Sequence, residues 1–358
     1  MYILLIILIL ILFYNHKGVP IFLYHQVNPK SNVDPLTFEE HLKIISNKKM
    51  NTITLEEYGQ GNIPKNSMLI TLDDGYYDNY LYVYPLLKKY NMKATIFLNT
   101  LYLKESRDEI EDIEANNMAN YRAMEKFKKT GCGKSNQYMS WEEIKEMHKS
   151  GLVDFQCHSH KHVAIIKEFK IEGFYKGDEK DPTDMYLYGK ISEGYPIFPK
   201  RGEYSGPGII MDIRFLDVFK DFYLNTLKDK DKKNALKLAN EFLEDNKEKY
   251  FKFENIEDFK IRITEDLNDN MEAIRSHLNK KAKYFCWPWG HRSKEAIKIM
   301  ENLGIEGFIT TKKGTNSYNP NWKMIRRIEL RKFSPEKFKT NLFIARNLIL
   351  GKIYGWIS

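Results

Sequence analysis

Cysteine is scarce in this chain of 358 residues, and its charges form no block of one sign. The three cysteines, Cys132, Cys157 and Cys286, are few and odd in number, so the sequence predicts no disulfide framework. Lysine and arginine number 56 against 48 aspartates and glutamates, but the two signs are mixed along the chain. Without a basic patch or a recognition motif, nucleic acid is not an expected partner. The net charge of +8 favours an anionic glycan or membrane surface only as an overall field.

Long apolar runs are also absent, except at the N-terminus. Every residue from Tyr2 to Tyr14 is apolar or aromatic, and the run ends at Asn15. As a helix rising about 1.5 Å per residue it would reach about 20 Å, short of a hydrocarbon core of about 30 Å. A secretory signal has a charged segment before its apolar run and a small-residue cleavage site after it, and this sequence has neither. We therefore expect residues 1–17 to form an uncleaved membrane anchor or signal-like segment, followed by one domain over residues 18–358.

The rest of the chain alternates between short strand-like and longer helix-like segments. Its 42% hydrophobic and 14% aromatic content is ample for a large core. Seven segments are typical of buried strands, at 21–24, 53–54, 69–72, 95–98, 153–157, 284–287 and 307–310. Helix-like segments follow at 37–48, 80–90, 140–149 and 293–303, the third opened by the capping box Ser-Trp-Glu-Glu at 140–143. Repeated units of this kind predict an α/β fold, a distorted (β/α)7 TIM-like barrel with catalytic residues at the carboxyl ends of its strands.

Two aspartates and two histidines lie where predicted strands end. Asp73 and Asp74 follow the apolar run 67–72, and His158 and His162 follow the run 152–157. A spacing of four lets both histidine rings point the same way if the segment turns like a helix. One carboxylate and two imidazoles can hold a divalent metal ion, while the other carboxylate accepts a proton from water. Each motif alone is also explained by turn chemistry or a solvated loop, but together they predict a metal hydrolase.

These motifs resemble those of the polysaccharide deacetylases, the NodB-type carbohydrate esterases. Thr-Leu-Asp-Asp-Gly at 71–75 resembles their Thr-Phe-Asp-Asp-Gly signature, and His-Ser-His-Lys-His at 158–162 matches their His-Ser/Thr-x-x-His signature. Cys-Trp-Pro-Trp-Gly at 286–290 resembles a degenerate form of their third motif, Arg-x-Pro-Tyr-Gly. The segments 20–27, 37–42 and 53–57 are similar to the circularly permuted branch that contains the poly-N-acetylglucosamine deacetylases.

The resemblance implies a role for each matching residue. Asp74, His158 and His162 would bind the divalent metal ion, most commonly zinc (Zn2+) in this family. Asp73 would be the general base that activates water, and His25 the general acid that protonates the leaving amine. Cleavage of an amide needs a nucleophile, a stabilised oxyanion and a proton for the nitrogen, so the implied roles agree with the chemistry.

The third motif departs from the family pattern at its first residue. The family's arginine, which orients the catalytic aspartate, falls on Cys286, and a thiol cannot make that two-pronged contact. Arg327, near the end of the next predicted strand, could replace it as a catalytic residue, and the alternative is a surface arginine. Pro288 and Trp289 would lie at the substrate, where the backbone N–H of Trp289 aligns with the family's oxyanion donor.

Two segments, 104–137 and 166–281, do not fit a minimal barrel and are expected to be insertions. The first is highly charged, and the second is rich in glycine and aromatic residues before it becomes helix-like. Insertions after barrel strands lie over the active site, so the second could form a wall or lid. Its tyrosines could stack on sugar rings, although core packing explains aromatic residues more often; they include Tyr175, Tyr186, Tyr188, Tyr195 and Tyr204.

Both ends of the chain bear on its location. The C-terminal segment 342–357 is apolar and basic, and we expect a final helix packed on the barrel, with a membrane-surface helix as the alternative. Lys17 beside the N-terminal run favours a cytoplasmic domain. The usual substrates of the family favour the outside instead. We therefore expect a membrane-anchored, extracytoplasmic domain, in the bacterial periplasm or at the cell surface.

The sequence thus predicts a metal-dependent hydrolase that removes N-acetyl groups from the amino sugars of a cell-surface polysaccharide. One alternative is a hydrolase of another non-peptide amide or of an O-acetyl ester on the same fold. Another is a catalytically inactive glycan-binding module, because the third-motif arginine is missing.

Overall fold

The structure is a computed structural model that describes residues 17–29, 31–61, 63–106, 138–177, 191–331 and 334–357. The expected anchor up to residue 16 lies outside the described residues, as do most of the first insertion (107–137), Tyr186 and Tyr188. Among the helices that are described, none combines the length and the apolar character needed to cross a membrane.

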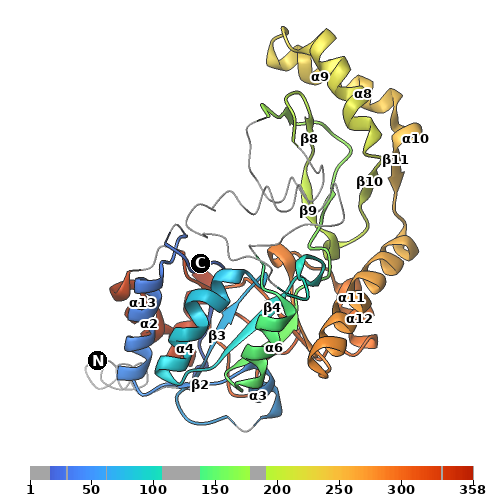
Figure 1. Cartoon of the computed structure of the whole chain (residues 1–358). Helices are drawn as coiled ribbons and strands as arrows, with labels where there is room; N and C mark the ends of the chain where they lie inside the picture. The colour runs from blue at the N-terminus through green and yellow to red at the C-terminus, as the bar shows by residue number, and fades with distance from the viewer. Residues whose placement is uncertain are drawn as a thin grey trace, which may run out of the picture.

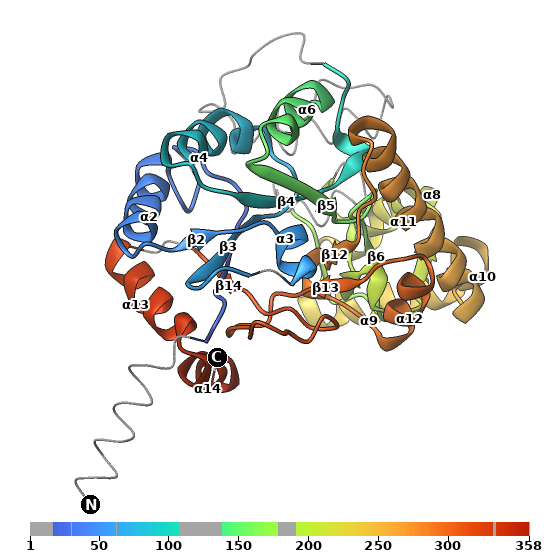
Figure 2. The ribbon, with the colours of Figure 1, turned by 90° about the horizontal axis from the view of Figure 1, so that it is seen from below.

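A curled parallel sheet forms the centre of the fold, as expected for an α/β protein of repeated βα units (Figure 2). Its order is β13-β12-β5-β4-β3-β1-β14, and β2 pairs with β3 outside this path. The strands are β1 Ile21–Tyr24, β2 Asn51–Thr52, β3 Ser67–Leu72, β4 Ala94–Leu98, β5 Val153–Cys157, β12 Tyr284–Cys286, β13 Gly307–Ile309 and β14 Ile328–Glu329. An isolated parallel bridge joins Ile309 in β13 to Ile325, just before β14, so the two edges of the sheet approach each other.

The expected strand at 53–54 is wrong, whereas the other six expected strands are confirmed to within two residues. Strand β2 ends at Thr52, and Thr54 begins a helix, α3 (Leu55–Gln60). The Thr54 side chain accepts a hydrogen bond from the Glu57 N–H, and the Glu57 side chain accepts one from the Thr54 N–H. This capping box satisfies two backbone donors at the start of the helix, which explains why the chain turns here.

Helices cover the outside of the sheet, and the capping box at Ser140 is confirmed. They are α2 Pro35–Asn47, α4 Tyr84–Tyr90, α6 Trp141–Lys149, α11 Ile256–Leu278, α12 Lys294–Asn302, α13 Pro335–Arg346 and α14 Leu348–Ile357. Helix α11 falls within the second expected insertion, yet Phe259, Ile263, Leu267 and Ile274 belong to the same core as the strands. We call the sheet with these helices the sheet region.

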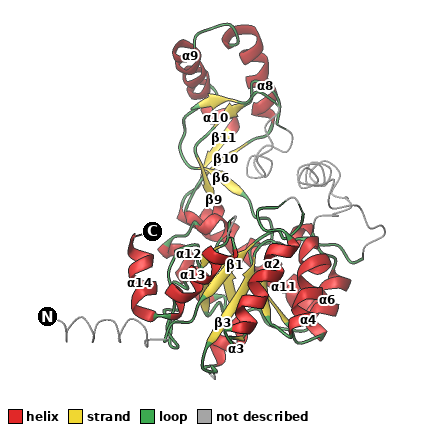
Figure 3. Cartoon of the chain, turned by 90° about the vertical axis from the view of Figure 1, so that its left-hand side faces the viewer, coloured by secondary structure: helices red, strands yellow, loops and turns green. Residues whose placement is uncertain are grey.

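The described residues between 164 and 253 form an arm that rises from one end of the sheet region (Figures 1 and 3). Its elements are β6 Ala164–Ile166, β7 Gly173–Phe174, β8 Pro196–Ile197, β9 Lys200–Gly202, β10 Ile209–Met211, α8 Arg214–Phe222, α9 Lys232–Asp245, α10 Lys247–Tyr250 and β11 Phe251–Phe253. Four strands form an antiparallel sheet in the order β11-β10-β6-β9, and β7 pairs with β8. A second core fills the arm and takes in Tyr102 and Tyr138 of the sheet region, and in it Tyr175 and Tyr195 are buried among phenylalanines. Tyr204 is also buried, in the core of the sheet region, so core packing rather than sugar stacking accounts for all three tyrosines.

Candidate active site

The two neighbouring aspartates separate at the carboxyl end of β3. The Asp73 N–H donates to the carbonyl of Tyr24 at 3.1 Å and so continues the pairing of β3 with β1. Asp74 has a φ of 77°, in the left-handed region, and Gly75 after it has a φ of 76°. This sharp turn lets the adjacent carboxylates face different partners. Asp73 contacts Arg327, and Asp74 lies next to the histidines.

Asp74, His158 and His162 converge as the sequence predicts. Asp74 Oδ1 lies 3.3 Å from His158 Nε2 and 3.6 Å from His162 Nε2, and all three side chains are buried. The Asn99 amide donates to Asp74 Oδ1 at 3.0 Å. His158 Nδ1 lies 2.8 Å from the carbonyl oxygen of Cys286, which leaves Nε2 facing Asp74. One carboxylate oxygen and two imidazole nitrogens form a donor set that fits a zinc-like divalent ion.

Burial and charge set the protonation of this group. Burial raises the pKa of Asp74, but the hydrogen bond from His158 and the charge of His162 outweigh it and hold that pKa well below its usual range. Burial lowers the pKa of His162 to about 4, so this ring is neutral, as a metal ligand must be. Burial also lowers the pKa of His158, but Cys286 and Asp74 raise it well above the usual value. A metal ion would therefore displace a proton from His158 on binding.

Arg327 makes the two-pronged contact that the third motif lacks. Its Nη1 donates to Asp73 Oδ1 at 2.7 Å and its Nη2 donates to Asp73 Oδ2 at 2.8 Å. Arg327 is 0% exposed, so it is not a surface arginine, and its Nε donates to the carbonyl of Thr310 at 3.0 Å. Burial raises the pKa of Asp73, but the charges of Arg327 and His158 lower it below its usual value. Asp73 is therefore ionised.

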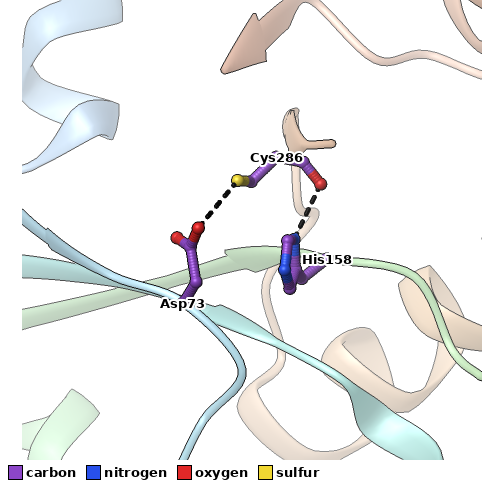
Figure 4. Close-up of side chains that lie close together, drawn as sticks. All are labelled: Asp73, His158 and Cys286. Carbon is purple, nitrogen blue, oxygen red and sulfur yellow. Dashed lines mark hydrogen bonds between the residues drawn. The ribbon is translucent and has the colours of Figure 1, made fainter. Parts of the chain in front are cut away.

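Cys286 links Asp73 to His158 (Figure 4). Its thiol lies 3.4 Å from Asp73 Oδ2 and accepts a hydrogen bond from Arg327 Nη2 at 2.9 Å. Its carbonyl oxygen faces His158. Asp73, His158 and Cys286 thus form a second group of possible metal ligands. Asp74 with the two histidines is the better candidate of the two groups, because Arg327 already engages both oxygens of Asp73 and burial raises the pKa of the Cys286 thiol.

His25 lies at the same end of the sheet, directly after β1. Its side chain is 41% exposed, and its Nδ1 lies 3.9 Å from Glu329 Oε1 at the end of the neighbouring strand β14. The Asn79 amide donates to the His25 carbonyl at 3.0 Å and fixes the backbone here. A positive charge on the His25 ring would lower the pKa of both Asp73 and Asp74. Glu329 carried no signal in the sequence, because only strand pairing brings it beside His25.

Trp289 stands between the histidine motif and the base of the arm. It has a φ of 52°, and its ring centroid lies 4.2 Å from that of His162. Pro288 before it is buried. A Cβ atom on Gly202 of strand β9 would lie 2.9 Å from the Trp289 ring, so glycine is needed for this close approach. The Gly202 N–H also donates to His291 Nδ1 at 2.9 Å, which joins the third motif to the arm.

Sequence comparison relates this chain to polysaccharide deacetylases. The sequence model described as polysaccharide deacetylase matches residues 60–175 and 256–308. Over these two segments the chain matches the polysaccharide deacetylase family. The Bacillus subtilis polysaccharide deacetylase YxkH is 42% identical over 86 residues, 22% of this chain and 31% of that protein. The poly-beta-1,6-N-acetyl-D-glucosamine N-deacetylase of Staphylococcus aureus (strain MSSA476) is 29% identical over 197 residues, 48% of this chain and 59% of that protein.

The match therefore spans about a third of one of these curated relatives and about three-fifths of the other. A solved de-N-acetylase from Aggregatibacter actinomycetemcomitans superposes with a TM-score of 0.59 at 14% identity, covering 90% of this chain and 99% of that one. That likeness shows a shared fold. The family match leaves out residues 176–255, which is most of the arm.

Backbone strain gathers at this candidate site. Of the eight non-glycine residues with positive φ among those described, four are Asp74, Ser159, His162 and Trp289. Each such residue costs about 1–3 kcal/mol and persists only where surrounding contacts fix it. The Ser159 hydroxyl, which accepts from the His162 N–H at 2.7 Å, is one such contact.

Helix α11 supplies two further contacts that sequence reasoning missed. The Asp266 carboxylate accepts hydrogen bonds from the backbone N–H groups of His160 and Lys161, each at 2.9 Å. The Asn270 amide donates to the carbonyl of Ser159 at 2.7 Å. Both side chains are 0% exposed. One sequence signal could have identified Asp266 and Asn270. Both are polar residues within the apolar helical stripe of Ile263, Leu267 and Ile274.

Proposed function

We propose that this chain is a metal-dependent deacetylase that hydrolyses N-acetyl groups on amino sugars of a cell-surface polysaccharide. The observation that carries the proposal is the convergence of Asp74, His158 and His162 next to an Asp73 held by Arg327. The named activity of the Staphylococcus aureus relative supports an N-acetylglucosamine polymer as the substrate class. Activity and substrate are proposed for this chain, because it spans only part of that relative.

Asp74, His158 and His162 would hold the divalent ion, and zinc is the ion we expect. When bound, the ion would supply positive charge that polarises the acetyl carbonyl and lowers the pKa of a water molecule. The Asn99 amide and the Cys286 carbonyl orient Asp74 and His158 for this task.

Asp73 would accept the proton of the attacking water. A carboxylate offers about four lone-pair positions. Arg327 occupies one on each oxygen, and the Cys286 thiol lies against Oδ2. Oδ1 therefore keeps a lone pair for the proton, while Arg327 holds the carboxylate in a single orientation.

His25 would donate the proton that lets the amine leave. His25 Nδ1 lies 3.9 Å from Glu329 Oε1, which would leave Nε2 for the leaving nitrogen. We propose the backbone N–H of Trp289 as a donor to the oxyanion, with Pro288 beside it at the substrate. Amide nitrogen is a poor leaving group until it is protonated, so His25 matters most for an N-acetyl substrate.

The proposed location is a membrane, with the catalytic domain outside the cytoplasm. Two points support it, the apolar run from Tyr2 to Tyr14 and the cell-surface position of the proposed substrate. No nucleic-acid partner is proposed.

Two alternatives are separable by experiment. The inactive glycan-binding module rested on the missing third-motif arginine, and the contact of Arg327 with Asp73 removes that reason. A hydrolase of O-acetyl esters or of another amide would use the same groups. Such an enzyme would depend less on His25 if its leaving group needs no proton.

The test is acetate release from a β-1,6-linked N-acetylglucosamine oligomer and from an activated acetyl ester. Asp73→Asn should keep the metal and lose turnover on both, since the base is needed for each. His25→Ala should slow the amide by about 10²–10⁴-fold and the ester far less. The exposed Asp217→Asn on α8 is the matched control and should change neither. Full acetate release by Asp73→Asn, or equal losses for His25→Ala on both substrates, would overturn the assigned roles.

A further inference from the structure

The C-terminal helix α14 leaves one apolar face uncovered. Ile349, Ile353, Trp356 and Ile357 are 37%, 48%, 85% and 80% exposed. Their spacing of three to four residues puts all four on the same side of the helix. Large apolar side chains gathered on one exposed face mark an interaction surface, whereas scattered ones do not.

The opposite side of α14 fixes the helix to the sheet region. A Cβ atom on Gly351 would lie 2.3 Å from Thr315 Cγ2, and one on Gly355 would lie 2.6 Å from the carbonyl oxygen of Lys313. At 3.6 residues per turn, the two glycines lie about 180° from the middle of the exposed face. The helix is therefore packed on the barrel, as expected, and this packing holds the apolar face outward.

A basic pocket adjoins this face. It encloses about 310 Å³ and is lined by Arg326, Lys352 and Trp356 together with polar groups that include Ser317 and Asn321. Its lining contains two cations and no carboxylate. Arginine, lysine and hydroxyl groups are ligands for phosphate, and tryptophan favours the interface between water and acyl chains.

The start of the described chain lies beside α14. The Gly18 N–H donates to the carbonyl of Arg346 at 2.9 Å, at the junction of α13 and α14 (Figure 2). The apolar run from Tyr2 to Tyr14 therefore precedes a segment that lies at the start of α14, the helix with the exposed face. A lipid surface that takes up this run would meet α14 first, while the arm rises from another end of the molecule (Figure 3).

We propose that the exposed face of α14 lies in an anionic membrane surface. The isoleucines and Trp356 would enter the acyl-chain boundary, and Arg326 and Lys352 would bind lipid phosphate. This contact goes beyond the catalytic proposal and does not depend on it. It would give the domain a second attachment and a fixed rotation relative to the membrane.

The test uses the full chain reconstituted in vesicles of phosphatidylcholine and phosphatidylglycerol with brominated acyl chains, which quench nearby tryptophan. The Trp356 signal is the difference between the wild type and Trp356→Phe. We expect strong quenching that falls about fivefold in Ile353→Asp, because a carboxylate does not enter the acyl-chain boundary. Ile261→Asp, at an isoleucine of α11 that is 55% exposed, is the matched control and should leave quenching unchanged.

The phosphate contact is tested with the same signal. Arg326→Gln/Lys352→Gln should weaken quenching in vesicles with phosphatidylglycerol but not in vesicles of phosphatidylcholine alone. Absent quenching of Trp356, or equal quenching in Ile353→Asp, would overturn the membrane contact. Shielding of Trp356 that rises with protein concentration in lipid-free detergent would also overturn it, since a second copy would then cover the face.

Discussion

The sheet region and the arm bury different kinds of side chain. At the strand ends of the sheet region, the buried side chains are charged or polar, among them Asp73, Asp74, His158 and Arg327. The core of the arm is almost wholly aromatic and aliphatic, with Phe215 and Phe219 at its centre. The family match follows the first region and skips most of the second. The candidate site thus belongs to the sheet, and the arm is an addition whose core also takes in Tyr102 and Tyr138 of the sheet region.

The two regions nevertheless meet at the histidine motif. The Tyr204 hydroxyl, just beyond strand β9, donates to Asp266 of α11 at 2.6 Å, and Asp266 holds the backbone of His160. The Val163 N–H donates to Glu203 at 3.2 Å, directly after His162. The base of the arm therefore supports the loop that carries the proposed metal ligands His158 and His162. Three substitutions test this division, from the largest expected effect on the site to the smallest.

Arg327→Lys should have the largest effect, because lysine cannot hold both oxygens of Asp73. We expect kcat for acetate release to fall by about 10²–10³-fold, comparable to the loss of a preorganised hydrogen-bond donor. Metal content should stay near that of the wild type, since Arg327 contacts no proposed ligand. Cys286→Ala, which removes the thiol contacts with Asp73 and Arg327 but keeps the two-pronged contact between those residues, is the comparison variant and should lose far less. Equal losses in the two variants would contradict the assignment of the orienting role to Arg327.

Asp266→Asn should have an intermediate effect, on metal affinity. The amide cannot accept both backbone N–H bonds of the histidine loop, and supporting contacts of this kind change metal affinity by about 10–100-fold. Competition with a chromogenic chelator measures the affinity. Asp269 is exposed on the same helix and accepts neither of these two bonds. Asp269→Asn therefore removes the same charge and should bind metal like the wild type. If both variants bind equally well, α11 has no positioning role.

Phe219→Ala should have the smallest effect on the site. It empties a fully buried position in the arm and should reduce the free energy of unfolding there by about 3–5 kcal/mol. We expect calorimetry to show an earlier transition for the arm while metal content is unchanged. Phe253→Ala, at an exposed phenylalanine of β11, should shift neither. Loss of metal in Phe219→Ala would show that the whole arm, and not only its base, supports the site.

The sequence predicts those site residues that a pattern of neighbouring residues marks. Asp73, Asp74, His158 and His162 each follow a short apolar strand, so strand ends and turn chemistry are enough to bring them to one edge. The same locality explains the confirmed capping box at Ser140.

Contacts between distant segments were harder to predict. Arg327 was named as a substitute for the third-motif arginine, but only the curl of the sheet sets it against a carboxylate 254 residues away. Glu329 and Asp266 were missed, because strand pairing and helix packing, rather than any local pattern, place them beside His25 and His160. The whole of α11 was assigned to the insertion, since its charged surface hid the buried stripe that joins the main core.

The central claim, that a metal ion at Asp74, His158 and His162 drives deacetylation, is tested most directly by titrating zinc into metal-stripped full-length protein. Acetate release from the N-acetylglucosamine oligomer would be followed at each addition. The account predicts no release without metal, a linear rise to a plateau at one equivalent, and neither binding nor release in His158→Ala/His162→Ala. Undiminished release from the stripped protein, or zinc-dependent release that persists in the double variant, would contradict it.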